Sequence, residues 1–256
     1  MINTHLIYST IIISGFSLVI LIFCPNLDIG FSKFFYSNIQ GFIYKNNFLV
    51  LYLFKVIPIA TKLLTASCIA YLLYKLLKYK KLKNILLSST FYLIITGLIG
   101  PGLIVNCILK ENFGRARPMQ TTYFNGFKSF SPALFISDQC NHNCSFSSGH
   151  AATAYYFTVF AYMSSYNNLQ LPNLLTLKRK VKKPSELQKK NFTFNTIYII
   201  GLLFGSLVGL SRILMGGHFL SDVIASCFIV LIVNHLLYLW WQRMNMSNSN
   251  VSQVII

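Results

Sequence analysis

The chain is 256 residues long, with 54% hydrophobic and 11% charged residues, and its mean hydropathy is +0.56. This balance excludes an ordinary soluble domain of the same length and indicates a protein that crosses a membrane several times. The formal net charge of +17 suggests a nucleic-acid partner. More than half of the basic residues, however, gather in two short loops between apolar runs, as they do beside a membrane. We therefore expect a membrane environment and no nucleic-acid partner.

Six apolar runs approach or exceed the length of about 20 residues that a helix needs to cross a bilayer. They predict an all-α integral membrane bundle of six helices, built as a single domain over residues 1–256. Strands are not expected, because a sheet edge exposed to lipid would leave backbone groups unpaired. The runs lie near residues 6–24, 49–74, 86–108, 149–168, 196–213 and 219–241.

The two basic clusters predict the orientation. One follows the second run, at Lys75–Lys83, and the other follows the fourth, at Lys178–Lys190. Loops two spans apart lie on the same side, and the positive-inside rule places both in the cytoplasm, together with both termini. The N-terminal run has no positive n-region and no clear cleavage site, so we expect a retained span rather than a signal peptide. The outer side then holds residues 25–48, 109–148 and 212–218.

Residues 31–47, between the first two spans, carry six aromatic side chains among small and polar residues. This composition predicts a segment on the outer leaflet, either a plain aromatic interface anchor or a guide for a lipid substrate. In the second span, Lys55 and Lys62 are seven residues apart and share a helix face. They either extend to the membrane surface or point inward as a functional pair, and both alternatives stay open.

Glycines mark two later spans. In the third run, three glycines surround Pro101 within residues 97–102, which indicates a bend or close packing. In the fifth run, glycines recur at every fourth position from Gly201 to Gly209. That spacing lets two membrane helices approach closely, and packing is a sufficient reason for it.

The six cysteines divide into two groups. Cys140 and Cys144 lie in the outer loop, where they form either a disulfide or two free thiols. With His142 between them they also resemble part of a metal site, although a fourth ligand is missing. The other four lie in or beside spans and are expected to be small apolar residues: Cys24, Cys68, Cys107 and Cys227.

Three polar stretches lie where apolar runs meet the outer side, and the first follows the third span. Lys110 and Arg117, with Arg115 between them, form a basic cluster that ends at Pro118. The positive-inside rule disfavours such a cluster on the outer face. An anionic ligand would account for it, because Arg presents a planar fork to two phosphate oxygens and Lys a compact charge.

The second stretch, Ser147-Ser148-Gly149-His150, opens the fourth span. The unpaired N–H groups and the positive dipole end of a helix start both favour an anion. Ser147 or Ser148 can cap the helix, and Gly149 lets a ligand approach the backbone. Capping does not account for His150, which indicates chemistry.

The third stretch joins the last two spans. Arg212 ends the fifth run, His218 begins the sixth, and Asp222 follows four residues later on the same helix face. A carboxylate there can hold one imidazole nitrogen as N–H and leave the other free as a nucleophile. Beside two other basic stretches, we expect this pair to be catalytic rather than structural.

Acidic residues are scarce, since the chain has five in all. They cannot assemble the carboxylate cluster of a two-metal phosphatase site. Phosphate chemistry here would therefore use no metal and no cofactor, with Lys and Arg neutralising the transferring group and histidines carrying out the covalent and proton-transfer steps.

Together the three stretches resemble the tripartite signature of the type 2 phosphatidic acid phosphatases, membrane lipid phosphatases related to vanadium-dependent haloperoxidases. The resemblance covers roughly residues 98–225 and implies a haloperoxidase-like helical core. One departure is Ser147, where the family usually has proline. The matching patterns are Lys110-x6-Arg117-Pro118, Ser148-Gly149-His150 and Ser211-Arg212-x5-His218-x3-Asp222.

The resemblance implies a role for each matching residue. His218 would attack phosphorus and form a phosphohistidine, and Asp222 would orient it. His150 would protonate the leaving oxygen, and water would then release phosphate. The phosphate-binding groups would be Lys110, Arg117 and Arg212, with the backbone at Ser148 and Gly149.

A narrower resemblance concerns the substrate. Residues 100–118, residues 143–146 and the early Pro25-Asn26-Leu27-Asp28 are similar to bacterial lipid A phosphatases of the 4′-phosphatase type. This implies removal of phosphate from lipid A at the periplasmic face of an inner membrane, with no obligate protein partner. The alternatives are phosphatases of undecaprenyl diphosphate or phosphatidylglycerol phosphate. A further alternative is a membrane anion transporter or structural protein that binds phosphate without turnover.

Overall fold

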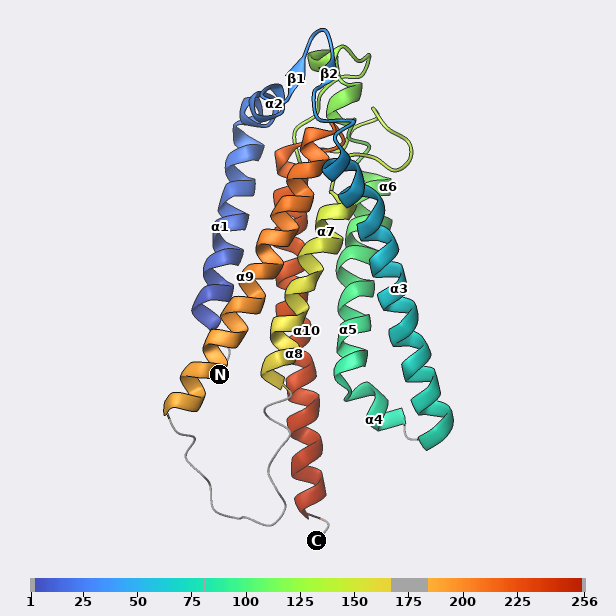
Figure 1. The fold of residues 1–256 in the computed structure, drawn as a ribbon, viewed down its shortest axis with the longest axis vertical. Coiled ribbons are helices and arrows are strands. Elements are labelled where there is room, and N and C mark those ends of the chain that lie inside the picture. Colours follow the sequence, from blue (N-terminus) through green and yellow to red (C-terminus); the bar gives the residue numbers. More distant parts are fainter. Residues whose placement is uncertain (1–2, 81, 167–183, 255–256) are drawn as a thin grey trace.

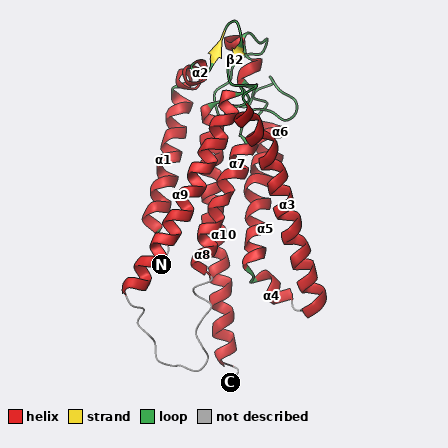
Figure 2. Cartoon of the chain, viewed as in Figure 1, coloured by secondary structure: helices red, strands yellow, loops and turns green. Residues whose placement is uncertain are grey.

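The computed structural model describes residues 3–80, 82–166 and 184–254. Long helices lie side by side along one axis, and short elements and loops gather at one end (Figure 1). Helix dominates the described chain, as Figure 2 shows, so the predicted all-α membrane fold is confirmed. In chain order the elements are α1 (Thr4–Phe23), α2 (Pro25–Lys33), β1 (Tyr36–Ser37), β2 (Gly41–Phe42), α3 (Phe48–Tyr79), α4 (Leu82–Leu86), α5 (Ser89–Gly97), η1 (Leu98–Leu109), α6 (Lys110–Asn112), η2 (Pro118–Gln120), η3 (Thr122–Phe124), α7 (Gly149–Tyr155), η4 (Tyr156–Thr158), α8 (Val159–Tyr166), α9 (Pro184–Leu214) and α10 (Leu220–Val254).

The predicted count of six spans is approximate. The fourth predicted span, 149–168, consists of α7 and α8 in line, separated by the short 3-10 turn η4, and it is described only as far as Tyr166. At that turn the Thr158 hydroxyl donates to the Tyr155 carbonyl at 2.9 Å, an alternative to regular helix bonding. Among the described residues, five helices are long and apolar enough to cross a membrane: Thr4–Phe23, Phe48–Tyr79, Ser89–Asn112, Asn191–Leu214 and Leu220–Met246.

The third of these spans changes its winding where the sequence predicted a break. Residues Leu98–Leu109 form a π-helix (η1) with Pro101 inside it. Proline has no N–H for the usual helical bond, and the Asn106 side chain donates to the Pro101 carbonyl at 2.7 Å. The helix resumes as α6 at Lys110, so this wider stretch sets the direction in which Lys110 leaves the span.

Helix α7 packs between α9 and α10, and the glycines of α9 allow the close approach. A Cβ atom at Gly205 would lie 2.1 Å from the Tyr155 ring, and one at Gly209 would lie 2.3 Å from Val223 in α10. Both distances are shorter than van der Waals contact. The predicted packing role of these glycines is confirmed.

The expectation of no strands was wrong at a small hairpin. Strands β1 and β2 pair antiparallel outside the spans, where a sheet edge does not face hydrocarbon. Its aromatic residues pack on the short elements at this end of the bundle: Phe42 is buried, and its ring lies 5.2 Å from the ring of Phe124 in η3, at a tilt of 45°.

The two ends of the bundle carry different parts of the chain. The hairpin, α2, α6 and the long loop before α7 gather at one end, and the start of α1, the end of α10, α4 and the end of α3 lie toward the other (Figure 1). The basic cluster Lys75–Lys83 therefore lies toward the same end as the start of α1 and the end of α10. The second cluster, Lys178–Lys190, falls largely outside the described residues.

Candidate active site

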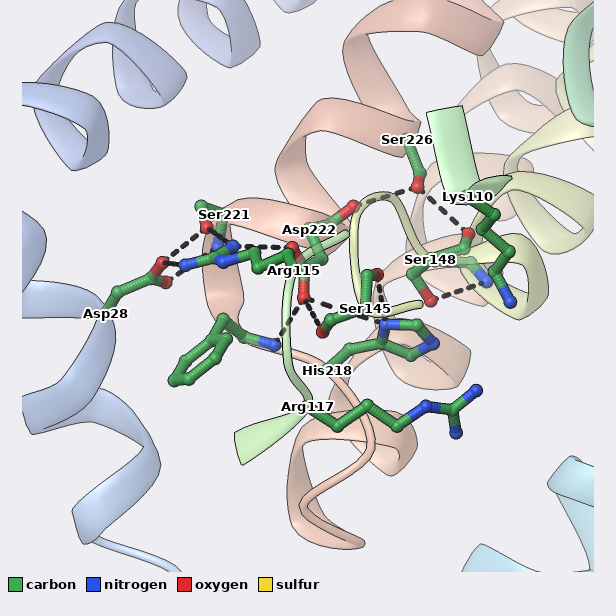
Figure 3. Close-up of polar contacts among 12 residues, drawn as sticks. Asp28, Lys110, Arg115, Arg117, Ser145, Ser148, His218, Ser221, Asp222 and Ser226 are labelled. Carbon is green, nitrogen blue, oxygen red and sulfur yellow. Dashed lines mark hydrogen bonds and ion pairs between the residues drawn. The ribbon is translucent and has the colours of Figure 1, made fainter. Parts of the chain in front are cut away.

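The three predicted polar stretches meet at the end of the bundle opposite the start of α1 and the end of α10 (Figure 3). The backbone N–H of Ser148, which caps α7, donates to the Asp222 carbonyl in α10 at 3.2 Å. The loop before α7 also contacts α10, because Ser145 binds both His218 and Asp222. The structure thus gathers residues that are far apart in the sequence: Lys110 in α6, Arg117 before η2, Ser148, Gly149 and His150 at the start of α7, Arg212 near the end of α9, and His218 and Asp222 at the start of α10.

His218 is oriented chiefly by a main-chain group. Its Nδ1 lies 2.8 Å from the Ser145 carbonyl, which can accept only if Nδ1 carries the proton. Asp222 Oδ2 lies 3.6 Å from the same nitrogen, so the carboxylate is a neighbouring charge rather than the hydrogen-bond acceptor expected from the sequence. The other nitrogen, Nε2, lies on the side of Arg117 and Lys110 (Figure 3), with no hydrogen-bond partner among the described residues.

The surroundings of His218 keep its imidazole neutral. The residue is 1% exposed. Burial lowers the pKa of His218 to about 3, although the negative charge of the nearby Asp222 carboxylate acts in the opposite direction. A neutral imidazole with a proton on Nδ1 has a lone pair on Nε2, which is what a nucleophile requires.

Asp222 is held by three donors and is fully buried. Its Oδ2 accepts from the Ser145 hydroxyl at 2.6 Å and from the Phe219 backbone N–H at 2.8 Å, and its Oδ1 accepts from Arg115 Nη1 at 2.6 Å. These charge-assisted bonds hold the carboxylate in place beside His218. Sequence spacing located Asp222 on the helix face but did not identify Ser145.

Arg115 and Asp28 extend this network into α2. Arg115 is 1% exposed, and its Nη2 donates to Asp28 Oδ2 at 2.8 Å. The guanidinium also lies over the Phe219 ring, 4.4 Å from the centroid. Although burial opposes the charge of Arg115, the carboxylates of Asp222 and Asp28 raise its pKa. The sequence placed Arg115 in a basic cluster and Asp28 in a family-like stretch, but nothing local to either residue indicated this ion pair.

Asn143 positions two of the predicted phosphate-binding cations. Its side-chain oxygen accepts from Lys110 Nζ at 2.9 Å, and its carbonyl accepts from Arg117 Nη2 at 2.9 Å. Asn143 has a φ of 50°, in the left-handed region that asparagine tolerates better than most residues. Asn143 lies inside the loop closed by a disulfide between Cys140 and Cys144. Of the two alternatives for these cysteines, a disulfide or two free thiols, the structure has the disulfide.

The alternative that Cys140, His142 and Cys144 form part of a metal site was wrong. The two sulfurs are joined to each other. The ring of His142, which would have been the third ligand, lies 2.7 Å from Glu111 Oε2 on the surface.

Phe54 of α3 supports Arg212 and His150. The Arg212 guanidinium lies 4.4 Å from the centre of the Phe54 ring, and the His150 ring stacks on it with centroids 4.9 Å apart. His150 Nε2 also lies 3.2 Å from the Phe54 carbonyl. Arg212 Nη1 contacts Met215 Sδ at 3.0 Å, and its buried Nε has no hydrogen-bond partner among the described residues. No sequence signal distinguished Phe54 from the other aromatic residues of the span.

At the start of α7, one of the two backbone N–H groups predicted to bind phosphate is used in a hydrogen bond within the protein. Ser148 is the cap, with its hydroxyl 3.4 Å from the Ala151 N–H, whereas the Ser147 hydroxyl is buried and has no partner in the described chain. Of the two predicted backbone donors, the Ser148 N–H binds the Asp222 carbonyl, so the Gly149 N–H is the one that remains for a ligand. A Cβ atom at Gly149 would lie 2.4 Å from Asn106 Oδ1, so any larger residue there would have to displace the Asn106 side chain.

A mostly apolar cavity of about 550 Å³ adjoins these groups. Lys110, Gly149 and His150 line it together with residues of α3, α5 and η1, among them Leu93 and Lys62. Lys55 and Lys62 are both exposed, and of the two only Lys62 lines the cavity.

Comparisons with known proteins show which family the chain resembles. A family model described as the PAP2 superfamily matches residues 85–246. A protein of Francisella tularensis subsp. novicida (strain U112) named Lipid A 4′-phosphatase is 32% identical over 238 residues, which cover 89% of this chain and 92% of that protein. Proteins of the same name from Rhizobium leguminosarum and Rhizobium etli are 52% identical over 59 residues and 54% identical over 57 residues. These shorter matches cover 23% and 22% of this chain, and 25% and 22% of the two proteins. No solved structure matches.

Proposed function

The chain belongs to the PAP2 superfamily and is a multi-pass membrane lipid phosphatase, and on this basis we propose that it removes the 4′-phosphate of lipid A. We propose that it does so at the periplasmic face of a bacterial inner membrane, through a phosphohistidine and without a metal ion. The observation that carries the proposed mechanism is the contact of His218 Nδ1 with the Ser145 carbonyl, which leaves Nε2 available on the side of Lys110 and Arg117.

The first half of the reaction forms a bond between histidine and phosphorus. Lys110, Arg117 and Arg212 bind the phosphate and offset its negative charge. The Nε2 lone pair of His218 attacks phosphorus, the bond from phosphorus to the sugar oxygen breaks, and His150 donates a proton to that oxygen. In the second half, His150 takes a proton from water, the water oxygen attacks phosphorus, and the bond to Nε2 breaks to release phosphate.

The positive charge on the imidazole must be balanced while the phosphohistidine exists. The Ser145 carbonyl accepts from Nδ1–H, and the Asp222 carboxylate lies 3.6 Å away. The carboxylate is negative and the carbonyl oxygen partly negative, and both are already in position before the reaction starts. They therefore stabilise the positive charge on the imidazole as it develops.

The cavity beside His150 supports a lipid substrate. It is mostly apolar and runs along α3 and α5 from the phosphate-binding end. An acyl chain in this cavity would hold the head group next to Lys110 and His150, and the binding energy of the chain would help to orient the phosphate.

The carboxylates of the site support chemistry without a metal. Asp28 and Asp222 both bind Arg115, and Asp222 is further occupied by Ser145 and Phe219. Neither is directed to the phosphate side, where the charged groups are cations that would repel a metal ion. A chelator should therefore leave the rate unchanged, and vanadate, which mimics the transferring phosphoryl group, should inhibit.

The test is phosphate release from lipid A by the purified protein in detergent, with tandem mass spectrometry to locate the lost phosphate. We expect the 4′-phosphate to be released, and His218→Ala to lower the rate by at least about 1,000-fold because the nucleophile is gone. His142→Ala is the matched control, since that imidazole is 82% exposed and pairs with Glu111 on the surface. Undiminished activity of His218→Ala would exclude the proposed mechanism.

The same assay separates the alternatives. Release from undecaprenyl diphosphate or phosphatidylglycerol phosphate, but not from lipid A, would change the substrate and keep the mechanism. Binding of these lipids without release from any of them would favour an anion transporter.

A further inference from the structure

Asp28 lies outside the region that matches the family model, residues 85–246, yet its side chain binds Arg115 in the hydrogen-bond network of the site. It belongs to α2, and its side chain is 1% exposed. Figure 3 shows it on the far side of Arg115 from Asp222, away from the phosphate-binding residues Lys110 and Arg117. A buried carboxylate in this position requires an explanation, because burying a charge is costly unless it is paired.

Each oxygen of the Asp28 carboxylate has partners in the start of α10 or in Arg115. Oδ1 accepts from the Ser221 backbone N–H at 2.8 Å. Oδ2 accepts from Arg115 Nη2 at 2.8 Å and also from the Ser221 hydroxyl. Asp28 therefore accepts from an N–H in the first turn of α10, the helix that begins two residues after His218.

Arg115 transmits this contact to Asp222. The Nη1 that donates to Asp222 Oδ1 at 2.6 Å also donates to the Ser221 hydroxyl at 2.7 Å. Two carboxylates thus share one guanidinium, and Ser221 touches both the guanidinium and Asp28. If Asp28 lost its charge, Arg115 would be neutralised by Asp222 alone, and Asp222 would offset less of the charge that develops on His218.

We propose that Asp28 is a positioning residue for phosphoryl transfer, which acts through Arg115 and Ser221 on Asp222 and so on His218. The inference rests on the proposed function. It assigns to α2 a part in the chemistry that the matched family region alone does not contain.

The proposal predicts an effect on turnover rather than on substrate binding. Asp28→Asn keeps the shape of the side chain and removes its charge. We expect kcat per folded molecule to fall by about 10- to 100-fold, with KM within about two-fold, because Lys110 and Arg117 bind Asn143 and have no hydrogen bond to Asp28 in the described chain. Asp138→Asn, an exposed acid of the outer loop, is the matched control and should behave as wild type.

A double-mutant cycle separates positioning from a general loss of stability. In an Asp222→Asn background, Asp28→Asn should lower kcat by less than about three-fold further, because the residue through which it acts is already changed. An equal additional loss in both backgrounds would show a structural role and overturn the proposal, as would a wild-type kcat in Asp28→Asn.

If Asp28→Asn does not yield folded protein by size-exclusion chromatography, Ser221→Ala takes its place. That change removes the hydroxyl between Arg115 and Asp28 but keeps the backbone contact, and it should lower kcat by about three-fold or more at unchanged KM. A wild-type kcat in Ser221→Ala would contradict the proposal. Failure of the wild-type protein to release phosphate from any lipid would instead contradict the proposed function.

Discussion

At the scale of single residues, His218 combines burial with a main-chain acceptor. The Ser145 carbonyl determines which ring nitrogen carries the proton, and burial keeps the ring neutral. A carbonyl does not titrate, so the tautomer of His218 depends less on pH than it would with a carboxylate as the acceptor. Asp222 is left to act as a charge, already bound by three donors.

The lowered pKa of His218 leads to a prediction about pH. An ordinary histidine titrates near 6.5, whereas His218 should stay neutral down to about pH 3. As the pH falls below about 6.5, the histidine of the unfolded protein binds a proton before His218 of the folded protein does. The free energy of unfolding should therefore decrease between about pH 6.5 and 3, and His218 should have no such effect above pH 6.5.

Nuclear magnetic resonance of ¹⁵N-histidine in detergent micelles tests this. The resonance that disappears in His218→Ala should not titrate between about pH 5 and 8. A midpoint near 6.5 for His218 would contradict the prediction.

Asn143 illustrates a second residue-scale feature. Its side-chain oxygen accepts from Lys110 and its backbone carbonyl accepts from Arg117. The sequence placed these two cations in one stretch but did not identify Asn143 as their partner. The contacts join positions 33 and 26 residues apart. Neither hydropathy nor motif spacing reports such a contact, because both describe neighbours along the chain.

At the scale of elements, the position of α7 depends on the glycines of α9. Helix α7 carries Ser148, Gly149 and His150, so its distance from α9 also sets the distance between His150 and Arg212. The four-residue glycine spacing was visible in the sequence and correctly predicted close packing. Its partner helix was not visible, because a run of small residues does not specify what packs on it.

Gly205→Ala should destabilise the protein. The added Cβ would lie 2.1 Å from Cδ1 and 2.5 Å from Cγ of Tyr155, near the fixed end of the ring, so the helices must separate. We expect a cost of about 1–3 kcal/mol, measured as a lower midpoint of thermal unfolding in detergent. Gly30→Ala in α2 is the matched control, since nothing lies within 4 Å of its added Cβ, and it should be neutral or slightly stabilising. Equal midpoints for the two variants would contradict the packing role.

At the scale of the whole molecule, the two ends of the bundle carry different groups, and the orientation deduced from charge stays a prediction. The site, α2 and the hairpin lie at one end, and the start of α1, the end of α10 and the Lys75–Lys83 cluster lie toward the other (Figure 1). The positive-inside rule would place the second end in the cytoplasm.

This orientation predicts different labelling of two engineered cysteines. In a background in which the four free cysteines are serine, Asn38→Cys at the hairpin should react with a membrane-impermeant maleimide once the outer membrane is permeabilised. Lys78→Cys, near the end of α3, should react only after the cells are lysed. Both positions are exposed, so a difference reports the side of the membrane rather than burial. The reverse pattern would contradict a periplasmic site.

The sequence by itself determined the membrane class, the approximate spans and the residues of the three polar stretches. Run length, residue type and spacing along a helix are local properties, and they can be read without the fold. Only the tertiary structure decided which groups hold those residues: Ser145 on His218, 73 positions away, and Asp28 on Arg115, 87 positions away. Hydrogen-bond partners so distant in the chain depend on how the helices pack, which no local pattern encodes.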